Sequence, residues 1–386
     1  MSRGIYVHIP YCQRRCSYCD FATFELDLKK NGYLEPKEYV DLVCQEIQAR
    51  GSLWAEQHIK SIYFGGGTPS LVPPEYISQI LSSIRSAGIN FDTLTTEITI
   101  EINPETLTTK SLDSYIKMGI NRFSVGAQTF HPKILKSIGR DHDPSQIIST
   151  LNLLKERDLN YTFDLLFALP NQTIDDLKKD LDTISNFSPK HLSAYCLTVP
   201  SGHPLEHGRP AEEHQVEMFG IITDSLKQIN LKKYEISNFA VPGFESKHNL
   251  LYWQDEDYLG VGLSAHSHLL QDSNGIRFWN PKTFNEYKSM VVKGSSLDQI
   301  DDQFKESLSY EEALTDFCHV SLRLTEGLGM DKLRYRFGES VMDLVVPRLQ
   351  NLEKKTLILP TENGYTLTAK GELLSNQVFQ ELLFSK

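Results

Sequence analysis

The sequence lacks several features that would place the protein in a special class. No apolar run approaches the roughly 18 residues of a membrane-spanning helix, and no tandem repeat or glycine/serine-rich linker interrupts the 386 residues. Basic residues are in deficit, 39 against 50 acidic ones, and the net charge of −11 excludes the overall positive surface of a typical nucleic-acid-binding protein. We therefore expect no nucleic-acid partner. The first residues show no leader peptide, so we expect a cytoplasmic protein that at most associates peripherally with a membrane.

Cysteine is scarce, and half of it lies in one place. Cys12, Cys16 and Cys19 fall within eight residues, whereas the other three of the six cysteines are dispersed. In a reducing compartment such a group indicates metal or redox chemistry before a disulfide. The C-x3-C-x2-C spacing can supply three thiolates to a [4Fe–4S] cluster and leave one iron open. A structural zinc with His8 as a further ligand is the alternative.

The remaining pattern predicts an α/β fold. Short apolar runs alternate with amphipathic segments at steps of roughly 30 residues, which is typical of βαβ units and a parallel sheet. Six such units predict an incomplete (β/α)6, TIM-like barrel. The predicted strands are 4–9, 61–64, 97–102, 122–126, 161–167 and 191–198, and the predicted helices are 36–49, 74–86, 108–118, 144–157, 174–186 and 212–229.

The last third of the chain changes character. We divide the sequence into a partial barrel at 1–230, a barrel extension at 231–305 and a mainly helical domain at 306–386. In the last domain, helices at 310–323, 331–337, 340–352 and 369–384 and short strands at 357–359 and 365–367 resemble a winged helix. Because this segment is not notably basic, we expect a structural or partner-docking role rather than DNA binding.

Several chemically distinctive residues lie in the predicted strands or just after them. They are a glycine-rich turn at 65–67 followed by Thr68, and the polar side chains of Glu101, Gln128 and Asp164. Active sites of barrels gather at the C-terminal ends of strands, so these positions are expected to meet in space. The alternatives are a simple tight turn for the glycines and a surface carboxylate for Glu101.

The motifs resemble those of a known family. C-x3-C-x2-C after a first strand resembles the radical S-adenosylmethionine (SAM) enzymes, and further stretches resemble the oxygen-independent coproporphyrinogen III dehydrogenase group: 6–12, 65–70, 101–104, 124–130 and 164–173. Those enzymes carry a fourth cysteine where this chain has Phe21. An H-N-x-x-Y-W motif at 248–253 and Phe21 make the chain most similar to the HemW-type heme chaperones, although Leu263 and Ser264 depart slightly from the family pattern.

The resemblance implies a set of site residues. It implies a [4Fe–4S] cluster on the three cysteines, SAM as cofactor and heme as cargo. The implied SAM residues are Tyr6, Tyr18, Gly66, Gly67, Thr68, Glu101, Gln128, Arg140 and Asp164. Arg140 is alternatively a solvated loop arginine. Cys196 is expected near the adenine and not on metal, and Cys44 and Cys318 are expected to be buried helix residues.

For heme, the resemblance points to His248, with Tyr252 and Trp253 packed against the porphyrin. The alternative is an aromatic cluster that closes the barrel mouth, in which His248 is only hydrogen-bonded. His266 and His268 are weaker candidates.

The sequence is compatible with three functions. The first is a heme chaperone, a monomer or homodimer, that delivers heme to an acceptor hemoprotein such as a membrane respiratory enzyme. The second is oxidative decarboxylation of coproporphyrinogen III, and the third is radical SAM chemistry on another substrate. Phe21, the H-N-x-x-Y-W motif and the short segment before Tyr6 favour the first, without decarboxylase activity.

Overall fold

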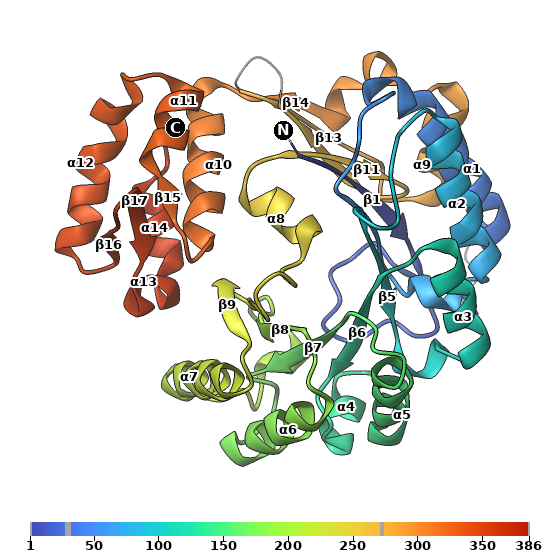
Figure 1. The fold of residues 1–386 in the computed structure, drawn as a ribbon, viewed down its shortest axis with the longest axis horizontal. Coiled ribbons are helices and arrows are strands. Elements are labelled where there is room, and N and C mark those ends of the chain that lie inside the picture. The colour runs from blue at the N-terminus through green and yellow to red at the C-terminus, as the bar shows by residue number, and fades with distance from the viewer. Residues whose placement is uncertain (1, 28–31, 271–273, 385–386) are drawn as a thin grey trace.

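The computed structural model describes residues 2–27, 32–270 and 274–384. Its centre is a twelve-stranded sheet with the order β14-β13-β12-β11-β1-β4-β5-β6-β7-β8-β10-β9 (Figure 1). The six strands predicted from the sequence form its middle, and neighbours pair in parallel. Their bounds are β1 Arg3–Ile9, β4 Ser61–Gly66, β5 Glu97–Ile102, β6 Arg122–Gln128, β7 Tyr161–Phe167 and β8 His191–Cys196. The incomplete barrel is therefore confirmed.

Helices cover the outer side of the sheet, as Figure 1 shows. They are α1 Pro36–Arg50, α2 Pro74–Ser86, α3 Thr109–Met118, α4 Pro132–Ser137, α5 Pro144–Lys155, α6 Ile174–Phe187 and α7 Glu212–Gln228. Proline in the first turn and capping boxes at Thr108, Asp143 and Thr173 fix where several of these helices begin. The six predicted helices and strands end within two residues of the observed bounds. Of these seven helices, only the short α4 was not predicted.

The residues that follow α7 extend both edges of the sheet. β10 (Asn238–Ala240) and β9 (Lys232–Glu235) continue antiparallel beyond β8. On the other edge, β11 (Asp257–Val261) pairs in parallel with β1, and three antiparallel strands follow: β12 His266–Leu269, β13 Ile276–Trp279 and β14 Lys305–Ser307. β11 was not predicted because it is only five residues long and its parallel partner, β1, lies some 250 positions away in the chain.

The C-terminal residues form a separate hydrophobic cluster around helices and a three-stranded antiparallel sheet, β15-β17-β16. The bounds are α10 Tyr310–Arg323, β15 Leu328–Gly329, α11 Met330–Phe337, α12 Val341–Lys354, β16 Ile358–Pro360, β17 Gly364–Leu367, α13 Ala369–Leu373 and α14 Ser375–Glu381. This order agrees with the predicted winged-helix-like domain. A single helix over 369–384 is wrong, because Leu374 leaves helical geometry and divides it. The boundaries at 230 and 305 stay a prediction.

Helix α8 (Lys247–Trp253) lies between the C-terminal domain and the sheet (Figure 1). It contacts α10 on one side and β1, β4 and β11 on the other. The remaining helix, α9 (Phe284–Lys293), packs against α1. In the part of the chain that the structure describes, no helix is long and apolar enough to cross a membrane.

Candidate cofactor and cargo site

A cavity of about 460 Å³ opens at the C-terminal ends of the parallel strands. All three clustered cysteines line it, together with eight of the nine residues expected to contact SAM; Tyr6 lines a neighbouring cavity instead. The eight come from five different strands or the loops after them, so residues as far apart in the chain as Tyr18 and Asp164 meet here. This is the juxtaposition that the barrel topology predicts.

The three thiols occupy different surroundings. Cys12 is buried on β2 (Tyr11–Cys12), where burial raises the pKa of its thiol to about 11, and Thr68 Oγ1 lies 3.9 Å from its sulfur. Cys16 Sγ accepts a hydrogen bond of 3.3 Å from the Arg140 guanidinium. Cys19 Sγ lies 3.8 Å from Thr23 Oγ1. A guanidinium at this distance can pair with the negative charge of a metal-bound sulfur.

These thiols do not form a zinc site with His8. Both ring nitrogens of His8 are already engaged, Nε2 by the Ala22 carbonyl at 2.9 Å and Nδ1 by the Tyr6 hydroxyl at 3.1 Å. Across residues 2–27, 32–270 and 274–384, no three cysteine, histidine or acidic side chains are arranged to hold a single metal ion. Three thiols along one cavity wall, with a guanidinium beside them, fit the larger and anionic [4Fe–4S] group better.

The glycine-rich turn brings the end of β4 against the cysteine loop. Gly66 has a φ of +112°, and an added Cβ would lie 2.5 Å from the His8 ring. A Cβ at Gly67 would lie 2.6 Å from the Tyr11 carbonyl oxygen. Thr68 then donates its backbone N–H to that same carbonyl. The turn is therefore more than a tight bend: without side chains it lets the first and second parallel strands approach at the cavity.

Two carboxyl groups share the cavity. Glu101 accepts hydrogen bonds from the Tyr63 hydroxyl at 3.0 Å and from the Gly66 backbone N–H at 3.1 Å. Burial, reinforced by the charge of Asp164, raises the pKa of Glu101 to about 7. Burial also raises the pKa of Asp164, against hydrogen bonds from Ser193 and Ser124 that lower it. Glu101 is thus not a surface carboxylate, and the pair can accept hydrogen bonds from a polar ligand such as a ribose.

Gln128 adopts a strained backbone. Its φ is +68°, a left-handed value, and the register of β6 against β7 shifts between Val125 and Gln128. Such strain in a non-glycine residue is typical of functional sites, where the surrounding structure maintains it. Here the irregularity ends β6 with the Gln128 side chain among the cavity-lining residues.

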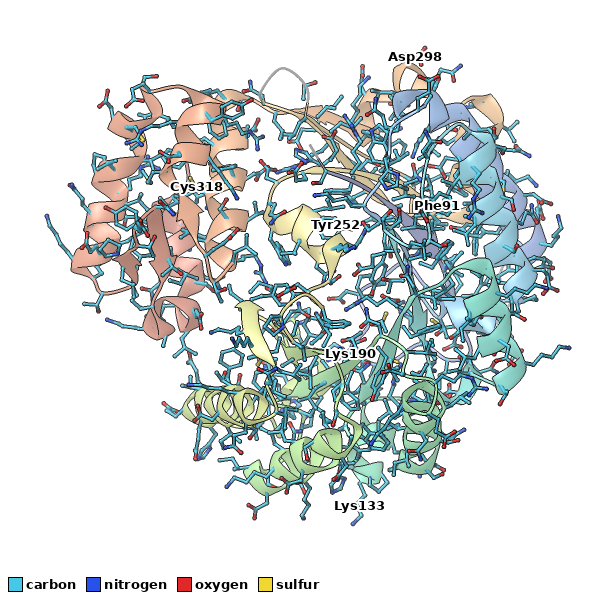
Figure 2. The ribbon with its side chains drawn as sticks, in the orientation of Figure 1. Phe91, Lys133, Lys190, Tyr252, Asp298 and Cys318 are labelled. Atoms are coloured by element: carbon cyan, nitrogen blue, oxygen red, sulfur yellow. The ribbon has the colours of Figure 1, made fainter. Side chains whose placement is uncertain are left out.

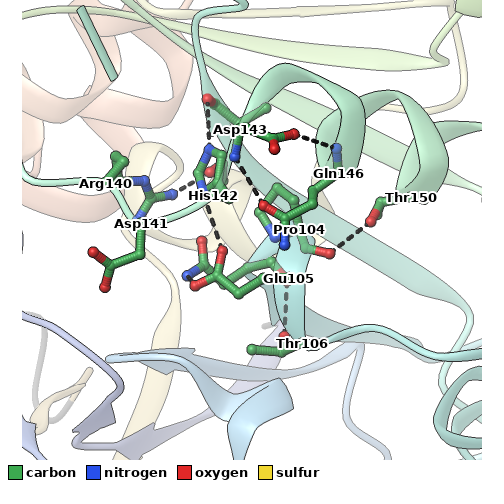
Figure 3. Close-up of polar contacts among 12 residues, drawn as sticks. Pro104, Glu105, Thr106, Arg140, Asp141, His142, Asp143, Gln146 and Thr150 are labelled. Carbon is green, nitrogen blue, oxygen red and sulfur yellow. Dashed lines mark hydrogen bonds and ion pairs between the residues drawn. The ribbon is translucent and has the colours of Figure 1, made fainter. Parts of the chain in front are cut away.

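Arg140 lies inside the site, and the alternative of a solvated arginine is wrong. Besides the bond to Cys16, its guanidinium donates to the Gly126 carbonyl, and its Nε is buried without a partner. The loop that carries it is fixed by the buried His142, whose Nδ1 lies 3.2 Å from Glu105 Oε2 (Figure 3). Figure 3 also shows Asp143, which caps α5 and ends the loop. Sequence reasoning missed His142; its position two residues after Arg140 is the only signal.

A second cavity of about 730 Å³ adjoins the first and shares Phe21, Tyr63 and Glu101 with it. Tyr6, Tyr252 and Tyr258 give it aromatic walls. Figure 2 shows Tyr252 on the side of α8 that faces the sheet.

The predicted heme motif is divided between two places. His248 lines the second cavity but is 1% exposed, with Nδ1 2.8 Å from Ser61 Oγ and Nε2 2.9 Å from the Tyr252 hydroxyl. Burial, with Arg122 adding to the effect, lowers the pKa of His248 to about 3. Trp253 instead packs against the Arg323 guanidinium of α10, 4.3 Å from its ring centre. The motif therefore joins the cavity to the C-terminal domain.

The two weaker histidine candidates differ in accessibility. His266 is exposed at the start of β12 and lines the second cavity. Partial desolvation of its ring by the surrounding protein lowers its pKa, and the charges of Lys282 and Arg277 lower it further. His268 is buried, and its Nδ1 lies 3.8 Å from Asp255.

Comparisons with known proteins decide the family. Residues 6–184 match the family model described as the radical SAM superfamily. The heme chaperone HemW of Bacillus subtilis is 30% identical over 99% of this chain and 99% of that protein. The heme chaperone HemW of Buchnera aphidicola from Schizaphis graminum is 37% identical over 74% of this chain and 75% of that protein. This chain belongs to the HemW family of radical SAM proteins.

The HemW-family chain also shares its fold with a solved structure. Coproporphyrinogen III oxidase (HemN) from Escherichia coli, a radical SAM enzyme, superposes with a TM-score of 0.83 over 99% of this chain and 90% of that one. The sequence identity is 23%, so the similarity is one of fold.

Other residues of this HemW-family chain that line the cavities were missed or behave differently from expectation. Arg122, at the start of β6, is 2% exposed and lines the first cavity, with its Nε 3.9 Å from Glu97 Oε2. In the sequence, a single arginine at the start of an apolar strand does not indicate that its side chain is buried beside a cavity. Cys196 is exposed at the end of β8, and Cys44 is only half-buried, whereas Cys318 is buried as expected.

Proposed function

We propose that this chain is a heme chaperone that carries a [4Fe–4S] cluster and SAM, binds heme, and transfers it to an acceptor hemoprotein. The main observation in favour of the proposal is that two cavities of different chemistry lie next to each other. One gathers the thiols, a guanidinium and two carboxyls, and the other has aromatic walls and histidines. The relatives named heme chaperones match this chain over most of its length, which supports the cargo.

In the first cavity, Cys12, Cys16 and Cys19 would hold the cluster. Arg140 would offset negative charge at Cys16, because its guanidinium already donates to that sulfur. When bound, the cluster and SAM supply one-electron chemistry. The glycine turn leaves room for the amino-acid part of SAM, and Glu101 and Asp164 would accept hydrogen bonds from its ribose.

The alternative is coproporphyrinogen III decarboxylation. That reaction needs the porphyrinogen side chain placed accurately against the reacting cofactor, and an error of about 1 Å can cost on the order of 10²-fold in rate. This chain has Phe21, 63% exposed, at the position of the enzymes' fourth cysteine and between the two cavities. We therefore expect cofactor binding without this turnover.

The acceptor that we favour is a membrane respiratory hemoprotein, reached from the cytoplasm by a monomer or homodimer of this chain. Exposed apolar side chains on the C-terminal domain, such as Tyr335 and Leu344, make that domain the candidate docking surface. We expect no role for nucleic acid.

The test uses one anaerobically reconstituted preparation of the full chain. Iron content, the SAM response of the reduced cluster's EPR spectrum, and a hemin titration followed by absorbance are measured together with coproporphyrinogen turnover. Transfer is measured by adding heme-loaded protein to membranes that contain a heme-depleted respiratory cytochrome, with free hemin as control. Heme binding and transfer that exceed the free-hemin control, without turnover, support the proposal. Sustained protoporphyrinogen formation supports the enzyme instead, and failure to bind hemin overturns the chaperone.

A further inference from the structure

We propose that His266 provides the protein ligand to heme iron in the second cavity, with Lys282 pairing with a propionate at its mouth. This inference rests on the proposed heme cargo and specifies where in the structure the heme would bind.

The volume and walls of the second cavity suit a large, mostly apolar ring. Its volume of about 730 Å³ lies within the range of small-molecule sites. Tyr6 and Tyr63 lie nearly parallel with ring centres 6.2 Å apart, and Tyr252 meets Tyr258 edge-on at 4.6 Å. Aromatic faces and edges of this kind provide large contact areas for a macrocycle.

An iron ligand needs a ring nitrogen with a free lone pair facing the ligand. Three histidines line this cavity, and two of them, His8 and His248, are buried with both nitrogens hydrogen-bonded inside the fold. Breaking either pair of bonds to reach iron would leave buried polar partners unsatisfied, which is costly inside a protein. Within the described residues, the ring nitrogens of His266 have no hydrogen-bond partner, and its side chain is exposed.

The sheet holds the His266 ring in a defined plane. His266 pairs across the strands with Trp279, and the two rings stack with centres 5.8 Å apart and an interplanar angle of 22°. A residue on a paired strand is positioned more accurately than one on a loop. The imidazole is therefore both oriented and open, as an iron ligand requires.

The positive charge at the mouth of the second cavity is complementary to the propionates of heme. Heme carries two propionates, and the exposed Lys282 lines the same cavity as His266. Of the histidines that line the cavity in the described chain, only the exposed His266 has free ring nitrogens, so ligation by histidine would come from this one residue. Such one-sided ligation would suit a protein that must release its heme.

The experiment compares hemin with metal-free protoporphyrin IX on the full-length protein. We expect His266→Ala to weaken hemin binding about tenfold or more and to shift the Soret band, because an iron–nitrogen bond is lost. Affinity for protoporphyrin IX, which has no iron, should stay within about twofold. Added imidazole should restore the Soret band of His266→Ala. Lys282→Gln should weaken both probes equally.

Controls separate ligation from folding and from the proposed function. His207→Ala removes an exposed histidine outside both cavities and should match wild type. His266→Gln keeps the size of the side chain and should lose the Soret shift without loss of thermal stability. If wild type binds hemin and His266→Ala keeps its Soret band and affinity, or if only His248→Ala shifts that band, the ligand assignment is wrong. If wild type binds neither probe, the proposed heme function itself fails.

Discussion

Replacing Glu101 by Gln should stabilise the SAM-free protein at alkaline pH while weakening its response to SAM. The Glu101 carboxyl has its pKa raised from 4.5 to about 7, chiefly by burial and then by the charge of Asp164. Below pH 4.5 the group is neutral in both the folded and the unfolded chain. Between 4.5 and about 7 the folded chain binds more protons, so the free energy of unfolding falls as the pH rises through this window.

The size of the effect follows from the same shift. A shift of this size corresponds to about 3 kcal/mol for a fully buried group. Because Glu101 is half-buried, solvent reduces the penalty, and we expect ~1–2 kcal/mol at pH 8. The amide can keep one acceptor for the Gly66 N–H, and the Tyr63 hydroxyl can rotate to accept from the new NH2 group. The variant should therefore lose little hydrogen bonding.

The assay is thermal unfolding of the SAM-free protein at pH 5 and pH 8. Glu101→Gln should raise Tm by a few degrees at pH 8, and the gain should shrink to a fraction of this at pH 5. Glu217→Gln, an exposed glutamate on α7, is the matched control and should change Tm at neither pH. Equal destabilisation by Glu101→Gln at both pH values would refute the inference that burial and the charge of Asp164 raise the pKa of Glu101.

Three further outcomes are expected. Replacing Cys12, Cys16 or Cys19 by Ala should abolish the ~400 nm absorbance and the content of about four irons per chain, and a full cluster in the triple variant contradicts the ligand set. His142→Ala should reduce the effect of SAM on the cluster's EPR spectrum several-fold at unchanged iron content, since it releases the Arg140 loop from Glu105; an unaltered SAM titration argues against that role. Trp253→Ala should cost about 2–3 kcal/mol of stability with unchanged hemin affinity, because its ring packs on Arg323; lost hemin binding in a stable variant would return Trp253 to the cargo site.

The sequence by itself determined the parts of this protein that depend on local pattern. The βα alternation and the residues that start helices, such as Pro74 and Thr108, were enough for six strands and six helices. The spacing of the three cysteines predicted the loop that we propose holds the [4Fe–4S] cluster. These signals are readable because each arises within one turn of helix or one strand.

Only the tertiary structure decided how distant residues divide their roles. The sequence treats the H-N-x-x-Y-W motif as one unit, but a helix directs its side chains to different faces. His248 and Tyr252 therefore point to the second cavity while Trp253 packs on the C-terminal domain. In the same way, both ring nitrogens of His8 and of His248 are hydrogen-bonded, one to a neighbour in the chain (Tyr6 or Tyr252) and the other to a more distant partner (Ala22 or Ser61). The ring nitrogens of His266 have no such partner within the described residues. Which imidazole is free depends on three-dimensional hydrogen bonding, and residue type and spacing do not encode it.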